Sequence, residues 1–180
     1  MARTQVWVYA LLIVLLVLPV IPGLEGWLRF DKEAILGGQS WRMVTAHFVH
    51  LGLSHALVNL VAMAILLAWA WRLLRFYEAG LFLLVSPLFL SLALLLMGID
   101  WYAGLSGMLH GLVVFLLLCS SNLIRNTGLL LLLLKLMWQF QSIQSVTTVS
   151  DNPILHEAHW IGAILGAVFF LISTIWQSRP

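Results

Sequence analysis

Six apolar segments, separated by short polar breaks, occupy most of this 180-residue chain. They cover roughly residues 6–21, 54–74, 81–97, 105–120, 128–143 and 157–176. Hydrophobic residues make up 62% of the chain and charged residues only 9%, whereas an ordinary soluble domain carries about 25% charged residues. Because a helix needs about 20 residues to cross a bilayer, the pattern predicts an all-α membrane protein. We expect a single domain over residues 1–180, a six-transmembrane-helix bundle whose solvent is the lipid bilayer.

The few charges predict how this bundle is oriented. With the N-terminus in the cytoplasm, most of the basic residues fall on the inner side, namely Arg3, Arg72, Arg75, Arg125 and Arg179. Only Arg29, Lys32 and Arg42 fall outside, in short loops where the positive-inside rule applies best. We therefore expect both termini in the cytoplasm. No small-x-small cleavage site follows the first apolar segment, so we interpret it as a retained helix rather than a signal peptide.

Charge and cysteine content exclude two further classes of function. The net charge is +2 and the basic residues are scattered singly, whereas nucleic-acid binding needs a basic patch or stripe. The one cysteine, Cys119, allows neither a disulfide framework nor a CxxC redox pair, and we expect it to be an inert core residue. The first outer loop, residues 23–43, mixes aromatic and charged residues. It is typical either of a segment lying in the membrane interface or of a solvated connector.

The histidines indicate where function resides. All six, at positions 47, 50, 55, 110, 156 and 159, fall near the predicted outer ends of the spans. Six independent residues would each have about an even chance of lying there. An ionisable residue within a membrane span is a functional candidate, because burying it costs free energy. The outer half of the bundle is therefore expected to use imidazole chemistry.

The first cluster of polar residues opens the second span. His50, His55 and Asn59 form the pattern HxxxxHxxxN. His55 and Asn59 are four residues apart and share a helix face, and both can donate hydrogen bonds to an oxygen. The same spacing also suits side chains that only bond neighbouring helices.

The second cluster is Gly104-Leu105-Ser106-Gly107-Met108-Leu109-His110-Gly111. Glycines on both sides of Ser106 allow close backbone approach, and a helix beginning there leaves free N–H groups. Such donors can stabilise an oxyanion that forms beside the serine. The alternative is that these small residues serve only the close packing of membrane helices, which is common.

The third cluster, His159-x2-Gly162-x3-Gly166, opens the last span. Small residues four apart let two helices come close together. If Gly162 and Gly166 pack against the glycines of the second cluster, His159 lies level with Ser106. A serine that attacks a carbonyl needs a base within about 3 Å to accept its proton. This packing would supply that base.

Taken together, the motifs HxxxxHxxxN, GxSG and AHxxGxxxG, in this order, resemble those of the rhomboid family of intramembrane serine proteases. The six-span layout agrees, and Trp41-Arg42 resembles the family's WR motif. The resemblance implies that Ser106 is the nucleophile and His159 the general base, without an acidic third member. It implies an oxyanion hole made by His55, Asn59 and the backbone N–H of Ser106. The residues that would support the dyad are His110, Gly104, Gly107, Gly162 and Gly166.

One departure from the family pattern refines the resemblance. Rhomboids usually carry an aromatic residue four positions after the serine, where this chain has His110. That variant and the small size resemble the rhombosortase branch of bacteria, which processes GlyGly-CTERM proteins. The implied substrate is a secreted protein with a C-terminal Gly-Gly motif, one transmembrane helix and a basic tail. The implied location is the bacterial inner membrane, with the active site open to the periplasm. His110 could stack on His159, hydrogen-bond it, or only fill the space of a tyrosine.

Lys135 lies within the predicted fifth span, and Gln139 follows it one turn later. Lys135 could extend toward the membrane surface or pair with a polar neighbour. The sharper hypothesis is that both residues face the entry side of the substrate and contact its helix.

Two other functions are compatible with the sequence. The chain could be a non-catalytic rhomboid-like binder of membrane helices, although an intact Ser106/His159 pair disfavours this. It could also be a histidine-rich metal or haem membrane protein. The segment His156-Glu157-Ala158-His159 comes close to HExxH, but its histidines are three apart rather than four. We therefore predict neither a metal nor another cofactor, and we predict hydrolysis or transfer through an acyl-enzyme.

Overall fold

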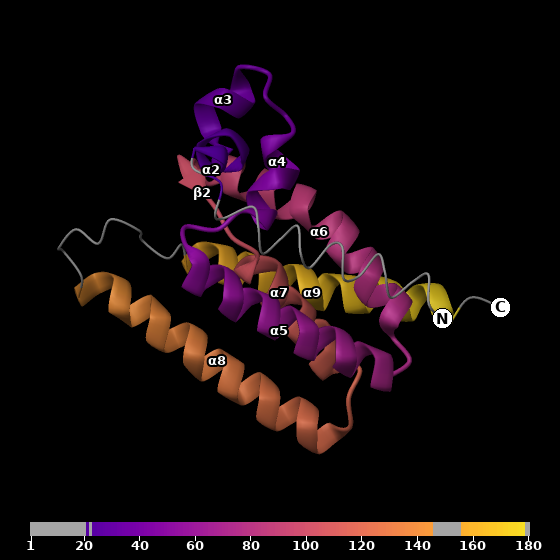
Figure 1. Cartoon of the computed structure of the whole chain (residues 1–180). Helices are drawn as coiled ribbons and strands as arrows, with labels where there is room; N and C mark the ends of the chain where they lie inside the picture. The colour runs from indigo at the N-terminus through magenta and orange to yellow at the C-terminus, as the bar shows by residue number, and fades with distance from the viewer. Residues whose placement is uncertain (1–20, 22, 146–155, 179–180) are drawn as a thin grey trace. The chain divides into compact units, whose positions relative to one another are not determined.

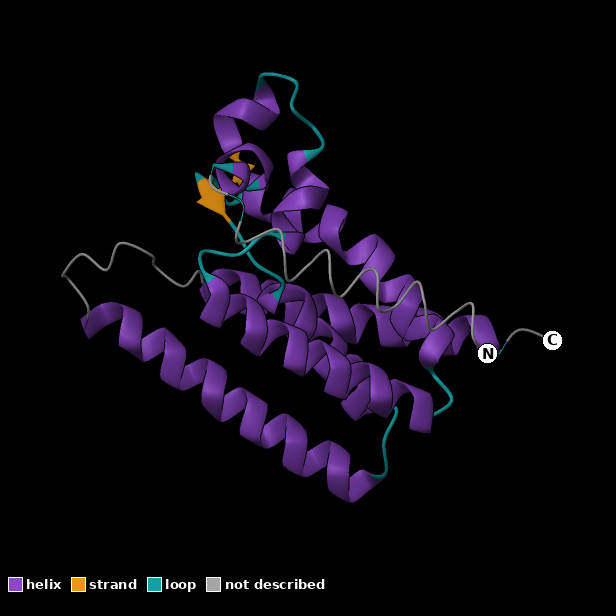
Figure 2. Cartoon of the chain, in the orientation of Figure 1, coloured by secondary structure: helices purple, strands orange, loops and turns teal. Residues whose placement is uncertain are grey.

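The computed structural model describes residue 21, residues 23–145 and residues 156–178. The described part is mostly helical, with one small sheet (Figure 2). It divides into two compact units. The first contains the described residues up to Ile65 together with Ser91–Ser106, and the second contains Leu66–Leu90 and the described residues from Gly107 onward. The predicted first span lies outside the described residues except for Ile21.

The first unit begins with short elements that no sequence pattern predicted. These are α2 (Leu24–Leu28), β1 (Phe30–Asp31), α3 (Lys32–Leu36), α4 (Arg42–Thr45), the 3-10 helix η2 (Ala46–Phe48) and β2 (Trp101–Tyr102). The two strands are antiparallel and pair Phe30 with Tyr102 and Asp31 with Trp101. Residues 23–43 therefore form a folded segment with its own short helices and a strand, rather than a plain connector.

Arg42 holds this folded segment together. Its side chain is buried, and its guanidinium donates to the carbonyl oxygens of Gly26 (2.9 Å) and Arg29 (3.0 Å) and to Gln39 Oε1 (2.7 Å). A buried charge needs such partners, because desolvation without them costs several kcal/mol. The arginine of the WR motif is thus a structural residue here, whereas Trp41 beside it is 47% exposed.

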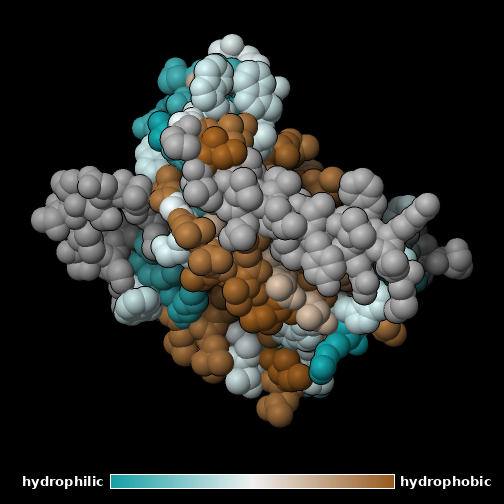
Figure 3. Space-filling view, in the orientation of Figure 1, coloured by the Kyte–Doolittle hydropathy of each residue, from teal (hydrophilic) through white to brown (hydrophobic). Residues whose placement is uncertain are grey.

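Three described helices are long and apolar enough to cross a membrane: α5 (Leu53–Arg72), α6 (Phe76–Leu96) and α9 (His156–Gln177). They match the predicted second, third and sixth spans within a few residues. Large apolar side chains on α5 are exposed, for example Val58 and Ile65 at 68% and 62%, and brown, hydrophobic residues gather in the middle of the face seen in Figure 3. Such a surface suits lipid rather than water. The chain is a multi-pass membrane protein. The count of six spans and the orientation of the termini stay predictions.

The fourth and fifth predicted spans correspond to α7 (Ser106–Leu118) and α8 (Asn122–Ser145). Helix α7 is apolar but has only 13 residues, a rise of about 20 Å, which is less than the hydrocarbon thickness of about 30 Å. Most of its residues are buried, as expected for a helix that is apolar on all sides. Helix α8 begins six residues earlier than predicted.

A seam of glycines joins α7 and α9 within the second unit (Figure 1). A Cβ atom on Gly162 would overlap the carbonyl group of Gly107, and one on Gly166 would overlap that of Gly111. A Cβ on Gly107 would lie 2.9 Å from the carbonyl oxygen of Ala158. The backbones of the two helices are thus in direct contact, and the glycine packing expected from the sequence is present.

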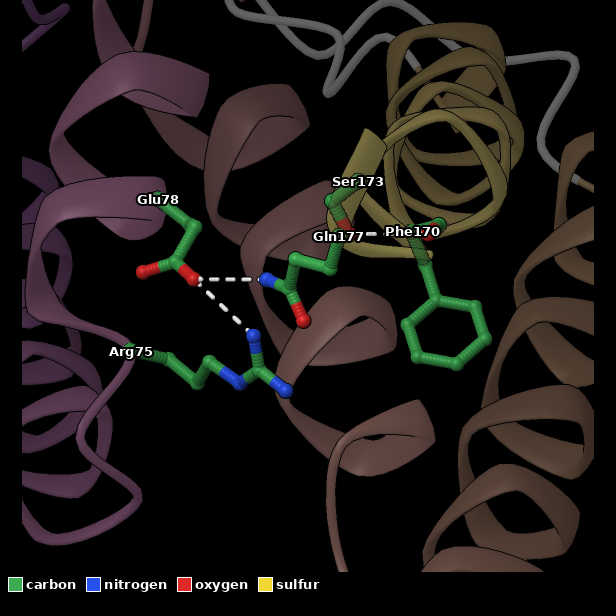
Figure 4. A network of polar contacts seen from close by, with 5 residues as sticks. All are labelled: Arg75, Glu78, Phe170, Ser173 and Gln177. Carbon is green, nitrogen blue, oxygen red and sulfur yellow. Dashed lines mark hydrogen bonds and ion pairs between the residues drawn. The ribbon is translucent and has the colours of Figure 1, made fainter. Parts of the chain in front are cut away.

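Aromatic and polar contacts complete the second unit. The ring of Phe169 on α9 packs edge-on against Phe82 and Phe115, with centroids 5.4 and 5.3 Å apart. Near the start of α6, Glu78 accepts hydrogen bonds from Arg75 (2.9 Å) and from Gln177 at the end of α9 (3.1 Å) (Figure 4). These contacts tie the first turns of α6 to the last turn of α9.

Candidate active site

Ser106 is the first residue of α7, and contacts within the first unit shape the loop that leads to it. Gly104 donates its N–H to the carbonyl of Ala46 (2.9 Å), and its own carbonyl accepts from the Tyr102 hydroxyl (2.5 Å). Its φ of 130° lies in the region that favours glycine. Because Ser106 begins a helix, the N–H groups of this first turn have no intrahelical acceptor. The serine is therefore presented at a helix end where backbone donors point out of the helix.

His55 and Asn59 lie on α5 in the same unit as Gly104 and Ser106. A Cβ on Gly104 would lie 3.1 Å from His55 Cε1, so the missing side chain lets the imidazole approach the loop. Asn59 is 4% exposed, and its Nδ2 has no hydrogen-bond partner among the described residues. A buried donor without an acceptor is costly. This donor is thus available to an oxygen that the described residues do not supply.

His47 and Ser91 form a buried polar pair that no sequence motif pointed to. The Ser91 hydroxyl donates to the carbonyl of Met43 (2.7 Å) and lies 2.9 Å from His47 Nε2. The His47 ring also packs against the Tyr102 ring, with centroids 5.4 Å apart. Through Tyr102 this pair supports the loop before Ser106. Only the position of His47 among the clustered histidines hinted at such a role.

His50 is buried beside His55, and their rings meet edge to face with centroids 5.2 Å apart. Neither ring nitrogen of His50 has a hydrogen-bond partner among the described residues. Burial, together with the neighbouring His55, lowers the pKa of His50 to about 4, because a dry site disfavours the charged imidazolium. His50 is therefore a neutral ring at physiological pH.

Replacing His50 by phenylalanine should flatten the dependence of stability on pH. The pKa of His50 is lower in the folded state than the ordinary 6.5, so the unfolded chain binds more protons between pH 6.5 and 4. Stability consequently rises with pH across this window, by on the order of 3 kcal/mol for this group. Thermal unfolding in detergent at pH 7.5 and pH 5 measures it. If wild type and His50→Phe lose the same stability between pH 7.5 and pH 5, the lowered pKa of His50 is wrong.

The second unit holds His159 and three side chains around it. His159, on the first turn of α9, is buried, and its ring stacks on the ring of His110 from α7, with centroids 4.1 Å apart and planes 13° apart. Its Nδ1 lies 3.2 Å from Gln139 Oε1, and His110 Nε2 lies 2.5 Å from Lys135 Nζ. His156 meets His159 edge to face at 5.9 Å. The rings of His110 and His159 are thus stacked, and the role of His110 in the site stays a prediction.

Lys135 and Gln139 thus have partners within the chain, and contact with a substrate stays a prediction for both. The signal that pointed to them was a charged residue inside an apolar span, with Gln139 on the same helix face one turn later. The partners could not be read from the sequence. Cys119 forms no disulfide and is half-buried, so it does not belong to the buried core expected from the sequence. Within the described ranges, no three His, Cys, Asp or Glu side chains are grouped so that they could hold a metal ion.

Comparison with known proteins places the chain in a family. The model of the Rhomboid domain matches residues 37–175, a stretch that contains every candidate residue described above. No curated protein matches the sequence significantly. Since the family match covers most of the chain, the chain belongs to the rhomboid family, whose members are intramembrane serine proteases acting on transmembrane substrates.

Proposed function

We propose that this rhomboid cleaves single-span membrane proteins with Ser106 as the nucleophile and His159 as the general base. The observation that carries this proposal is the glycine seam. Gly107, the residue after Ser106, packs on the carbonyl of Ala158, the residue before His159. A serine hydroxyl becomes nucleophilic when a histidine within hydrogen-bond reach accepts its proton. The stacked His110 and the hydrogen bond at Nδ1 support a fixed orientation of the His159 ring.

The proposed reaction proceeds in two steps. Ser106 Oγ attacks the scissile carbonyl carbon, and its proton passes to His159 Nε2. The tetrahedral intermediate collapses, the C–N bond breaks, and the imidazolium returns the proton to the leaving amine. Water, deprotonated by His159, then attacks the acyl-enzyme and releases a carboxylate and free Ser106. Another nucleophile in place of water would give a transfer product.

The oxyanion of the intermediate would be held by His55, Asn59 and the backbone N–H of Ser106. The support for this part of the proposal is the unpartnered Nδ2 of buried Asn59 and the close approach of His55 to Gly104. Preorganised donors of this kind act where charge develops in the transition state. They need no reorganisation when the substrate carbonyl becomes negative.

Asn59→Ala should slow cleavage by about 10²–10³-fold without abolishing it, as removal of one oxyanion donor typically does. The measurement is the rate of reporter cleavage at saturating substrate. Ser86→Ala is the matched control, because it also removes a buried polar group without a partner among the described residues, and it should retain wild-type activity. Wild-type rates for Asn59→Ala would remove this residue from the oxyanion hole.

For the substrate, we infer the class processed by rhombosortases, on the strength of His110 in place of the usual aromatic residue. The substrate would carry a C-terminal Gly-Gly motif, a transmembrane helix and a basic tail. Glycine weakens a helix by about 1 kcal/mol per residue relative to alanine, so the substrate would unwind most easily at this motif. The site would lie in the inner membrane of a bacterium and open to the periplasm.

Co-expression with a tagged reporter tests this assignment. One reporter carries the Gly-Gly motif, a helix and a basic tail, and the matched reporter has Leu-Leu in place of Gly-Gly. Selective cleavage of the first, mapped by blot and intact mass, is the expected result. A product heavier than the hydrolysed fragment would indicate transfer. Equal cleavage of both reporters would refute Gly-Gly selectivity, and no cleavage, also on a generic rhomboid substrate, would favour a non-catalytic helix binder.

A further inference from the structure

Helix α8 reaches both rings of the histidine stack. Two of its side chains, one turn apart, meet two histidines that come from different helices: Lys135 meets His110 of α7, and Gln139 meets His159 of α9. All four residues belong to the second unit. The sequence predicts α8 to be a membrane span, where polar side chains carry a free-energy cost. Two such residues beside two stacked imidazoles form one continuous polar arrangement.

The chemistry of the amide decides the tautomer of His159. Gln139 presents Oε1 toward Nδ1 at 3.2 Å, and an amide oxygen can only accept a hydrogen bond. Nδ1 must therefore carry the proton, which leaves the lone pair on Nε2. That is the tautomer which a general base needs, because a base whose Nε2 is already protonated cannot accept the serine proton.

Lys135 acts in the same way on the neighbouring ring. A lysine ammonium can only donate, so His110 Nε2, 2.5 Å from Lys135 Nζ, accepts. The His110 ring is then held in one orientation, with its face against the His159 ring at a centroid distance of 4.1 Å. The His110 ring is thus held by its hydrogen bond to Lys135. The His159 ring is held both by its hydrogen bond to Gln139 and by stacking on His110.

We propose that Gln139 is a positioning residue for the catalytic base, supplying from α8 the orienting acceptor that a third triad member would otherwise provide. This proposal rests on the proposed function, in which His159 is the base. A neutral amide fixes the ring and its tautomer without adding a negative charge. Lys135 steadies the arrangement through His110.

The test uses the full-length protein in detergent micelles and a fluorophosphonate probe, which reacts covalently with an activated serine and requires no knowledge of the substrate. For Gln139→Leu the maximal labelling rate should fall about 3- to 10-fold, the effect of losing one hydrogen bond, while the probe concentration at half-maximal rate stays unchanged. Gln177→Leu is the matched control. It removes a glutamine hydrogen bond to Glu78 at the other end of α9, and its labelling rate should equal that of wild type.

Gln139→Glu is the conservative variant and should restore the maximal rate, because a carboxylate also accepts from Nδ1. A nearby negative charge favours the protonated His159 ring. The acidic limb of the plot of labelling rate against pH should therefore move to higher pH in this variant. Among the described residues of the second unit, the other titratable groups that face His159 are His110 and His156, and Lys135 contacts His110. None of them differs between wild type and the variant.

The outcomes separate the two proposals. A wild-type protein that is not labelled at Ser106, or that is labelled equally well after His159→Ala, would refute the proposed catalytic pair whatever Gln139 does. Labelling of wild type that depends on His159, combined with an unchanged rate in Gln139→Leu or an unmoved acidic limb in Gln139→Glu, would overturn only the role of Gln139.

Discussion

Ser106→Ala is expected to abolish cleavage of every substrate that the wild-type protein cleaves, while leaving the fold intact. The hydroxyl is the only group that the proposed mechanism joins covalently to the substrate, and alanine cannot take its place. His159→Ala should lower the rate by about 10²–10⁴-fold, the usual contribution of a general base. Reporter cleavage in membranes, followed by blot at equal protein levels, measures both variants.

Ser120→Ala provides the matched control for the serine substitution. Ser120 lies just beyond the other end of α7 and donates to the carbonyl of Leu116 (2.8 Å), so the chemical change is identical but remote from the site. This variant should cleave at the wild-type rate. Full activity in Ser106→Ala would show that another nucleophile acts, and the proposed mechanism would then be wrong.

Gly162→Ala is expected to destabilise the protein by about 3 kcal/mol or more, at the upper end of what overpacking costs. The added methyl group would overlap the backbone carbonyl of Gly107, and a carbonyl cannot change rotamer to make room. The helices α7 and α9 would have to separate, so cleavage should fall together with stability. Thermal unfolding in detergent measures the first effect and reporter cleavage the second.

Gly80→Ala is the control, because it makes the same substitution within a helix where a Cβ atom would meet nothing within 4 Å. Alanine favours a helix over glycine by up to about 1 kcal/mol, so this variant should be as stable as wild type or slightly more stable. If the two alanine variants unfold at the same temperature, the backbone contact between α7 and α9 is not what the structure indicates.

The sequence predicted the membrane helices well because lipid imposes a simple rule. A span must be apolar for about 20 residues, and α5, α6 and α9 each meet that rule within a few residues of the predicted bounds. The glycine seam was predictable for a similar reason, since small residues four apart on two helices have few other uses. Each motif alone is weak evidence, but the three motifs occur in the order that is typical of the rhomboid family. The domain match confirmed the family.

Contacts between side chains on separate helices could not be predicted from the sequence. Gln139 and His159 are twenty positions apart, and no periodicity links a residue of one helix to a particular residue of another. The two-residue strands β1 and β2 were missed because a strand that short has no detectable alternation. The buried pair of His47 and Ser91 was missed because each residue, taken alone, is ordinary.

The glycine seam has a consequence for movement. Where side chains separate two helices, rotamer changes let the helices slide or part by small steps. A direct contact between two backbones has no such freedom, so the distance between α7 and α9 is fixed. We expect any opening that admits a substrate helix to be carried by other segments, while these two helices keep their distance throughout the catalytic cycle.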